Sequence, residues 1–244
     1  MITATRLSKR YGRVSAVDDV TFTCRPGTIT GFLGRNGAGK STALRMITGL
    51  TRPDSGGATI AGKPFAQLAN PARTVGTLLD AAAFHNGRTG RETLRIACTM
   101  TGMPRSRAET VLNAVDLAAD ADRRVGGYSL GMRQRLGFAH ALIGEPRVLI
   151  LDEPANGLDP EGIAWIRGLL RDFADRGGTV LLSSHLAEVQ ATADHLIIID
   201  HGRMVASGTQ RSLLADAGQT LEGLFLSLTS PKDSAVRTVR RDVR

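Results

Sequence analysis

The feature that most constrains this chain is a glycine-rich run, GRNGAGKS, at residues 34–41. The apolar segment TITGFL precedes the run, and STALRMITGL follows it with Leu44, Ile47 and Leu50 at helical spacing. A strand, a glycine loop and a helix in that order place backbone N–H groups and a helix N-terminus around an anion. The run therefore predicts a phosphate-binding loop that joins a buried strand to a helix.

Several side chains of this run have the chemistry that a bound nucleotide needs. Lys40 would reach the β- and γ-phosphates, and the hydroxyl of Ser41 would bind Mg²⁺. The flanking strand and helix argue against a glycine loop that arose by chance. The residues expected to contact the nucleotide here are Gly34, Arg35, Asn36, Gly37, Ala38, Gly39, Lys40, Ser41 and Thr42.

Two adjacent carboxylates lie in the second informative segment, RVLILDEP, at residues 147–154. The apolar run predicts a buried parallel strand, and Asp152 would stand at its carboxyl end, where α/β folds bind ligands. A carboxylate there can hold Mg²⁺ directly or through water, and Glu153 can orient and polarise an attacking water. Taken alone, the pair would fit a helix cap or plain strand-end acids equally well. Beside a phosphate loop, it indicates hydrolysis.

Strand-like and helix-like segments alternate along much of the chain. The apolar runs TVLLSS and LIIID are separated by the helical segment HLAEVQATA, whereas residues 88–145 are mostly helical in pattern. Such alternation predicts an α/β fold with a mostly parallel sheet. From Pro231 onward the sequence is polar and basic, which is typical of a mobile tail.

The segment YSLGMRQ, residues 128–134, resembles the signature sequence of the ABC ATPases and precedes Asp152 as it does in that family. In the family, the serine and glycine of this segment head a helix and bind the γ-phosphate of ATP held by the opposite subunit, which implies those roles for Ser129 and Gly131. The family's glycine pair appears here as Leu130-Gly131, so only the second glycine is kept. The resemblance extends over roughly residues 1–210.

Three further positions match motifs of that family. Tyr11, in RYG, resembles the aromatic residue that stacks on adenine, although an exposed tyrosine in a turn is the alternative. Asp159, in NGLD, matches the loop that faces the partner subunit. His185, which follows TVLLSS, matches the switch histidine that contacts the γ-phosphate. The resemblance thus implies Glu153 and His185 as the catalytic residues.

One position departs from the family pattern. The segment VGTLLD places Asp80 where the family usually has a glutamine that touches Mg²⁺ and the attacking water. An ionised aspartate can bind the metal through its oxygens, but it cannot donate a hydrogen bond. Either Asp80 occupies the glutamine's place or this chain has no direct equivalent.

The resemblance implies a P-loop NTPase core of α/β class with an N-terminal antiparallel β subdomain and an inserted helical subdomain at about 86–145. The ATPase domain would span 1–210, followed by a helical extension at 211–230 and the basic tail at 231–244. ATP and Mg²⁺ are the implied cofactors. The implied partners are a second ATPase subunit in a homodimer and a membrane-spanning permease chain, which would place this chain at the cytoplasmic face of the membrane.

Composition leaves one alternative to the transporter function open. The net charge of +8 would suit an ABC ATPase that acts on ribosomes or DNA. Against that alternative, the sequence shows one phosphate loop, no heptad stretch and no zinc cluster, so we expect no nucleic-acid partner. A non-catalytic ATP-binding scaffold would need a changed acid at Glu153, and that acid is intact. Cys24 and Cys98 have no metal-ligand spacing and are expected to be buried in a reducing cytosol.

Neither a signal peptide nor an apolar run of the roughly 18 residues needed to span a bilayer is visible. In the ABC family a short cytoplasmic helix of the membrane chain docks in a groove of the ATPase, and the resemblance implies that this groove is lined here by residues 78–88 and the helical segment after them. The run Ala81–Phe84 would form an apolar floor there or pack inside the domain. The segment LEGLFLSLT resembles the closing helix of ATPases from drug- and antibiotic-export systems, which favours an exporter.

Overall fold

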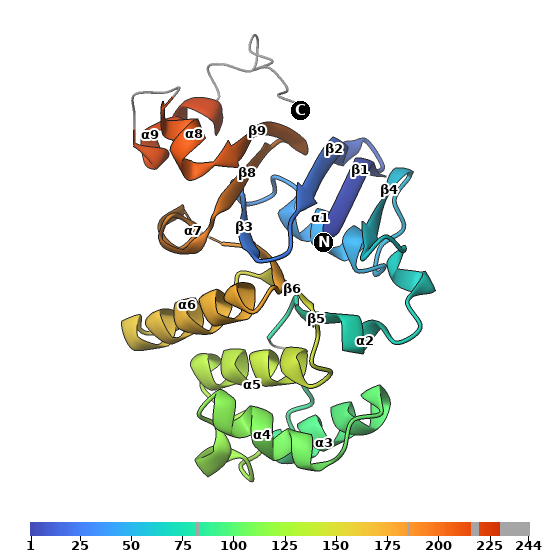
Figure 1. Cartoon of the computed structure of the whole chain (residues 1–244), viewed down its shortest axis with the longest axis vertical. Helices are drawn as coiled ribbons and strands as arrows, with labels where there is room; N and C mark the ends of the chain where they lie inside the picture. Colours follow the sequence, from blue (N-terminus) through green and yellow to red (C-terminus); the bar gives the residue numbers. More distant parts are fainter. Residues whose placement is uncertain (82, 185, 216–219, 230–244) are drawn as a thin grey trace.

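The computed structural model describes residues 1–81, 83–184, 186–215 and 220–229 and consists of two sheets with helices around them (Figure 1). The strands are β1 (Ile2–Tyr11), β2 (Val14–Cys24), β3 (Thr28–Leu33), β4 (Ser55–Ile60), β5 (Val75–Leu78), β6 (Val148–Asp152), β7 (Thr179–Ser183), β8 (His195–Asp200) and β9 (Arg203–Thr209). The helices are α1 (Lys40–Ile47), α2 (Pro71–Thr74), α3 (Gly90–Thr101), α4 (Ser106–Ala114), α5 (Leu130–Leu142), α6 (Pro160–Asp175), α7 (Leu186–Thr192), α8 (Gln210–Ala215) and α9 (Leu221–Thr229).

The larger sheet has the strand order β5-β6-β7-β3-β8-β9. In this sheet β5, β6, β7, β3 and β8 each pair in parallel with their neighbours, and β9 pairs antiparallel with β8. Successive side chains of β6 point to opposite faces: Leu149 and Leu151 enter one core, and Val148 and Ile150 enter the other. Because both faces are covered, the strands are continuous apolar runs. The mostly parallel α/β fold predicted from the sequence is confirmed.

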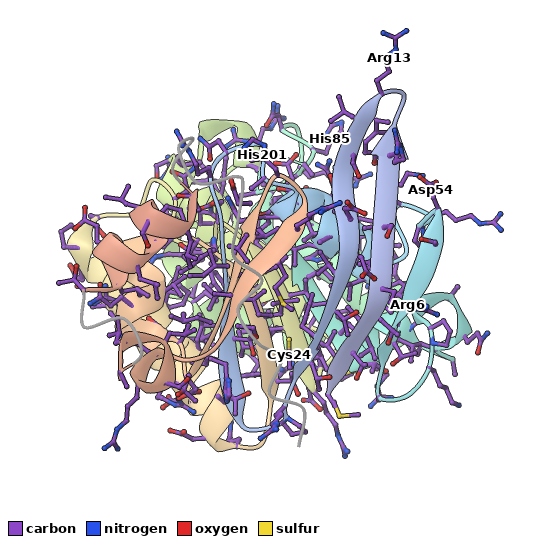
Figure 2. The ribbon with its side chains drawn as sticks, turned by 90° about the horizontal axis from the view of Figure 1, so that it is seen from above. Arg6, Arg13, Cys24, Asp54, His85 and His201 are labelled. Atoms are coloured by element: carbon purple, nitrogen blue, oxygen red, sulfur yellow. The ribbon has the colours of Figure 1, made fainter. Side chains whose placement is uncertain are left out.

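One face of the larger sheet packs against α1 and the smaller antiparallel sheet, whose order is β2-β1-β4. Helices α5 and α6 contribute to the core on the other face. Figure 2 shows Arg13 at the tip of the β1–β2 hairpin, with His201 and His85 toward the same end of the molecule and Cys24 toward the other. The end with Arg13 and His201 also holds the carboxyl ends of the parallel strands, since His201 directly follows β8. Ligands bind at these ends in α/β sheets.

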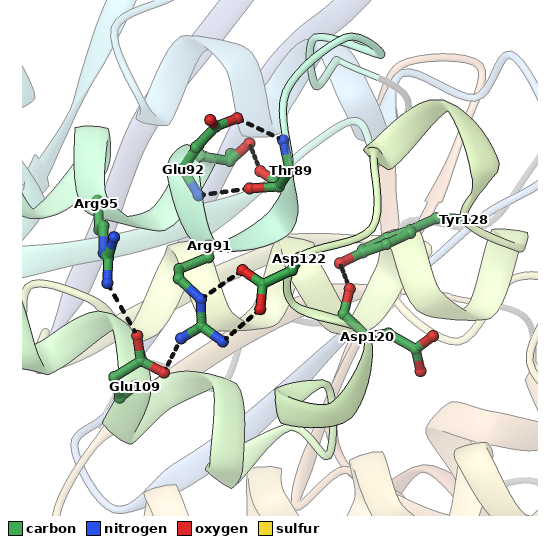
Figure 3. Close-up of polar contacts among 9 residues, drawn as sticks. Thr89, Arg91, Glu92, Arg95, Glu109, Asp120, Asp122 and Tyr128 are labelled. Carbon is green, nitrogen blue, oxygen red and sulfur yellow. Dashed lines mark hydrogen bonds and ion pairs between the residues drawn. The ribbon is translucent and has the colours of Figure 1, made fainter.

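The segment between β5 and β6 contains α3, α4 and α5, and polar contacts connect α3 with α4 and with the loop before α5 (Figure 3). Thr89 and Glu92 form a capping box at the start of α3. The guanidinium of Arg91 donates two hydrogen bonds to Asp122, at 2.8 and 3.2 Å, and one to Glu109 on α4. The hydroxyl of Tyr128 donates to the carbonyl of Asp120 at 2.8 Å. These contacts fix the loop that leads into α5.

The C-terminal part of the described chain lies beside β9. Helix α9 has a fully buried Leu221 and a buried Thr229, so it packs onto the core rather than extending away. None of the helices in the described part of the chain is long and apolar enough to cross a membrane. The domain limits expected from the sequence stay a prediction, and the expected basic tail at 231–244 lies outside the described residues.

Candidate functional site

The glycine-rich run forms the loop between β3 and α1, as its flanks predicted. Gly37 and Gly39 have φ angles of 80° and 104°, which L side chains rarely adopt. A Cβ on Gly39 would lie 2.1 Å from the carbonyl oxygen of Ala16, and one on Gly34 would lie 2.6 Å from that of Ile199. A Cβ on Gly37 would meet no atom within 4 Å. The loop is therefore pressed against the sheets on one side and open on the other.

Lys40 begins α1 and has only 8% of its surface exposed. Its Nζ donates to the carbonyl oxygens of Gly34 at 2.7 Å and Arg35 at 3.4 Å, and it lies 3.8 Å from Oε1 of Glu153. A buried ammonium needs such partners to offset its lost hydration. These contacts hold a positive charge inside the loop, beside the predicted catalytic carboxylate.

The two predicted carboxylates stand at the carboxyl end of β6, where Asp152 pairs with Ser183 of β7. The hydroxyl of Ser183 donates a hydrogen bond to Oδ1 of Asp152. The N–H of Glu153 donates to the carbonyl oxygen and to the hydroxyl of Ser183, at 3.0 and 3.2 Å. Sequence analysis had not singled out Ser183. The only signal was a polar residue that ends an apolar strand two positions before His185.

The residues predicted to hold Mg²⁺ have suitable chemistry. Ser41, in the first turn of α1, and Asp152, at the end of β6, provide a hydroxyl and a carboxylate. Mg²⁺ prefers oxygen ligands and is usually bound by one or two carboxylates together with phosphate oxygens and water. The open side of the glycine loop leaves space for those phosphates. This donor set fits the ion, and the assignment stays a prediction.

The signature segment and the loop that contains Asp159 pack against each other. Ser129 is the N-cap of α5 and accepts a hydrogen bond from the N–H of Met132 at 3.2 Å. A Cβ on Gly131 would lie 3.2 Å from Leu158, and Nε2 of Gln134 donates to the carbonyl of Asn156 at 3.4 Å.

Asp159 in turn caps α6, accepting from the N–H of Gly162 at 2.7 Å. The positions of Ser129, Gly131 and Asp159 are thereby fixed relative to one another.

These residues therefore fall into two groups. Lys40 and Glu153 come together at the phosphate loop, and Asp152 stands beside Glu153. In Figure 1, by contrast, α5 lies in the lower part of the molecule and α1 in the upper part, on opposite sides of β5 and β6. Helix α5, which Ser129 caps, is thus in a different part of the fold from the helix that follows the phosphate loop.

The other predicted residues are placed as follows. Tyr11 ends β1 with 52% of its surface exposed, and the ammonium of Lys9 lies 5.6 Å from the centre of its ring. Arg35, in the phosphate loop, points to α9 and donates to the carbonyl of Thr229 at 3.2 Å. Asp80 is exposed after β5, and its carbonyl accepts from the N–H of Ala83 at 3.3 Å. His185 lies outside the described residues.

The run beside Asp80 was expected either to form a docking floor or to pack inside the domain. Ala81 and Phe84 are half-buried against the core, and the ring of Phe84 lies 5.7 Å from that of His140 on α5. Ala83 is exposed, and Ala82 lies outside the described residues. Part of the run therefore packs inward, which leaves the docking prediction untested.

Comparison with known proteins decides the family. The profile of the ABC transporter family matches residues 17–156, which is more than half of the chain and includes the phosphate loop, the signature segment and both carboxylates. The chain belongs to the ABC transporter family. As an ABC ATPase it binds and hydrolyses ATP and serves as the motor of a transport system.

Curated relatives support this assignment. The chain is 42% identical over 209 residues to the bacitracin transport ATP-binding protein BcrA of Bacillus licheniformis, covering 84% of this chain and 68% of that protein. It is 37% identical over 228 residues to the doxorubicin resistance ATP-binding protein DrrA of Mycobacterium tuberculosis, covering 90% and 68%. It is 34% identical over 226 residues to the lantibiotic transport ATP-binding protein SrtF of Streptococcus pyogenes, covering 92% and 96%.

Solved structures share the fold. An ATP-binding subunit of an ABC transporter superposes with a TM-score of 0.85 at 29% identity, covering 93% of this chain and 99% of that one. A dimeric ATP-binding cassette bound to ADP and phosphate superposes with a TM-score of 0.78 at 22% identity, covering 86% and 98%. The P-loop NTPase fold expected from the sequence is thus confirmed.

Proposed function

We propose that this ABC ATPase drives an exporter whose membrane-spanning permease is a separate chain, and that the permease holds it at the cytoplasmic face of the membrane. The cargo class we propose is a drug or antibiotic. The support is that the similar proteins are described as acting in bacitracin transport, lantibiotic transport and doxorubicin resistance.

We further propose that two copies assemble head to tail. The observation that supports this is the separation of α5, which Ser129 caps, from α1, which follows the phosphate loop, because the two helices lie on opposite sides of β5 and β6. The N-terminus of α5 presents backbone N–H groups and a positive helix end, which favour an anion. A second copy would place this helix end opposite the first copy's phosphate loop and complete the site.

Within each site, the roles follow from the described contacts. Lys40, whose ammonium is held by carbonyl oxygens of the loop, would bind the β- and γ-phosphate oxygens, and the N–H groups of the glycine loop would surround them. Ser41 and Asp152 would hold Mg²⁺, which when bound neutralises charge on those oxygens. Glu153 would accept a hydrogen bond from the attacking water and orient it in line with the γ-phosphate.

The remaining site residues take supporting roles in the proposal. Tyr11 would stack on adenine, because an exposed ring at the end of β1 is free to offer one face. Asp159 would face the partner subunit, and His185 would contact the γ-phosphate. Asp80 would act near the metal through its carboxylate. ATP is the nucleotide in all of these assignments.

The transport role can be tested by fractionating cells that express the chain alone or together with a multi-span membrane protein from a neighbouring gene. We expect retention in membranes washed at high salt only in the second case, since the wash removes charge-based lipid binding. Lys40→Ala is the matched control, because it impairs nucleotide binding but leaves the docking surface intact. A protein that stays soluble in both cells and sediments with ribosomes or DNA would contradict the proposal.

A second arm tests the cargo class. The reconstituted complex should hydrolyse ATP faster when a compound that it exports is added, so a panel of peptide antibiotics and anthracyclines should include a stimulator. An importer-type binding protein that stimulates the complex instead would exclude export.

A further inference from the structure

Ser183 has a position in the site that none of the roles above uses. It is the last residue of β7, and its side chain is completely buried. Its hydroxyl lies between the two carboxylate residues, contacting the side chain of Asp152 and the backbone of Glu153. A buried hydroxyl at a strand end that contacts the side chain of Asp152 and the backbone N–H of Glu153 is well placed to control the geometry of both residues.

The hydroxyl of Ser183 makes two hydrogen bonds, one as a donor and one as an acceptor. A serine hydroxyl has a single proton to donate and two lone pairs that accept. The proton goes to Oδ1 of Asp152, and a lone pair accepts the N–H of Glu153 at 3.2 Å. Oδ1 of Asp152 is thus engaged by the Ser183 hydroxyl. The rest of the carboxylate is left to bind other groups.

The backbone of Glu153 also needs support. Its φ angle is +47°, in the left-handed region of backbone conformations that residues other than glycine rarely adopt. Such a conformation persists only where the surroundings hold it, and such residues cluster at active sites. Here the N–H of Glu153 is held by Ser183, and its carbonyl accepts from the N–H of Asn156 at 3.1 Å.

We propose that Ser183 is a positioning residue for hydrolysis: its hydroxyl orients the carboxylate of Asp152 for the metal and secures the strained backbone from which Glu153 projects. The inference rests on the proposed roles of Asp152 and Glu153. Alanine at this position would nearly fill the same space but would lose both contacts of the hydroxyl. Threonine would keep the hydroxyl and add a methyl group.

The test compares Ser183→Ala and Ser183→Thr with a matched control, Thr179→Val. Thr179 is at the opposite end of the same strand, is also buried, and its hydroxyl accepts from the N-terminal amine at 3.1 Å. The control thus removes a buried hydroxyl from β7 away from the site. Mn²⁺ binding in the presence of a non-hydrolysable ATP analogue is followed by the electron paramagnetic resonance signal of free Mn²⁺.

In Ser183→Ala, Mn²⁺ affinity should fall at least fivefold, kcat should fall at least tenfold, and nucleotide affinity measured in EDTA should not change. Ser183→Thr should recover most of both losses, and Thr179→Val should match the wild type. Wild-type Mn²⁺ affinity and kcat in Ser183→Ala would overturn the inference, as would a loss that Ser183→Thr does not recover. If Ser183→Ala does not fold, Ser183→Cys is measured by the same criteria, because it keeps the volume but is a weak donor.

Asp152→Asn separates this inference from the proposed site. If that variant binds Mn²⁺ like the wild type, the metal role of Asp152 fails, and the role of Ser183 fails with it. If Asp152→Asn weakens Mn²⁺ binding but Ser183→Ala does not, only the inference about Ser183 is contradicted.

Discussion

Gly39→Ala should disable the phosphate loop through backbone geometry alone, without removing any polar group. The residue has a φ angle of 104°, and a Cβ there would lie 2.1 Å from the backbone oxygen of Ala16 on β2. Forcing a non-glycine residue into such a conformation costs about 1–3 kcal/mol. The contact with Ala16 adds an overpacking cost of about 1–3 kcal/mol, because a backbone atom in a paired strand cannot turn aside as a flexible side chain does.

Together these terms predict a loss of about 2–6 kcal/mol in the free energy of unfolding. For a chain of this size, each kcal/mol lowers the melting temperature by about 2–4 °C, so the smallest expected shift is about 4 °C. Thermal unfolding followed by circular dichroism measures the shift, and fluorescent ATP titration measures the accompanying loss of affinity.

Gly57→Ala is the matched control for that measurement. Gly57 lies in β4, its φ is not positive, and a Cβ there would meet no atom within 4 Å. Its free energy of unfolding should change by no more than about 0.5 kcal/mol. A Gly39→Ala variant that melts with the control and binds ATP like the wild type would refute the reasoning.

Three further predictions follow from the described contacts. Lys40→Ala should weaken ATP binding by about 1.5–3 kcal/mol, the usual worth of a hydrogen bond to a charged group, and calorimetry that shows wild-type affinity would contradict this. Burial raises the pKa of Cys24 to about 12 from the usual 9.0, so the native thiol should resist iodoacetamide at pH 8. The protonated thiol should also stabilise the fold fully below about pH 9 and progressively less as the pH rises toward 12, unlike in Cys24→Ala. Asp80→Ala should spare ATP binding but weaken the Mg²⁺ dependence of turnover, whereas Asp80→Gln should be tolerated. Full activity in both Asp80 variants would mean that this residue is not at the family's glutamine position.

Much of the core could be predicted from the sequence because its signals are local. The glycine run lies between a strand and a helix, so β3 and α1 follow directly from it. The apolar runs that became β6, β7 and β8 are continuous because both faces of the sheet are covered. Strand β9 was not predicted, since RMVASGT has no apolar pattern of its own and depends on pairing with β8.

Other features depend on contacts between distant segments, which no local pattern shows. Ser183 and Asp152 meet only because β7 pairs with β6 after the intervening α6. Similarly, the contact of Gly131 with Leu158 depends on how α5 packs beside the loop after β6. Sequence patterns therefore predicted the residue types of the site, whereas the hydrogen bonds that orient those residues required the three-dimensional structure.

The central claim is that Glu153 activates the attacking water in a site completed by a second copy of the chain. Glu153→Gln tests it most directly, because the amide keeps the shape of the side chain but loses the basic oxygen. Light scattering coupled to size-exclusion chromatography, with ATP and Mg²⁺ in the buffer, should show this variant as a stable dimer, and phosphate release should be slowed at least a hundredfold. A monomer that hydrolyses ATP at the wild-type rate would contradict both the catalytic role of Glu153 and the composite site.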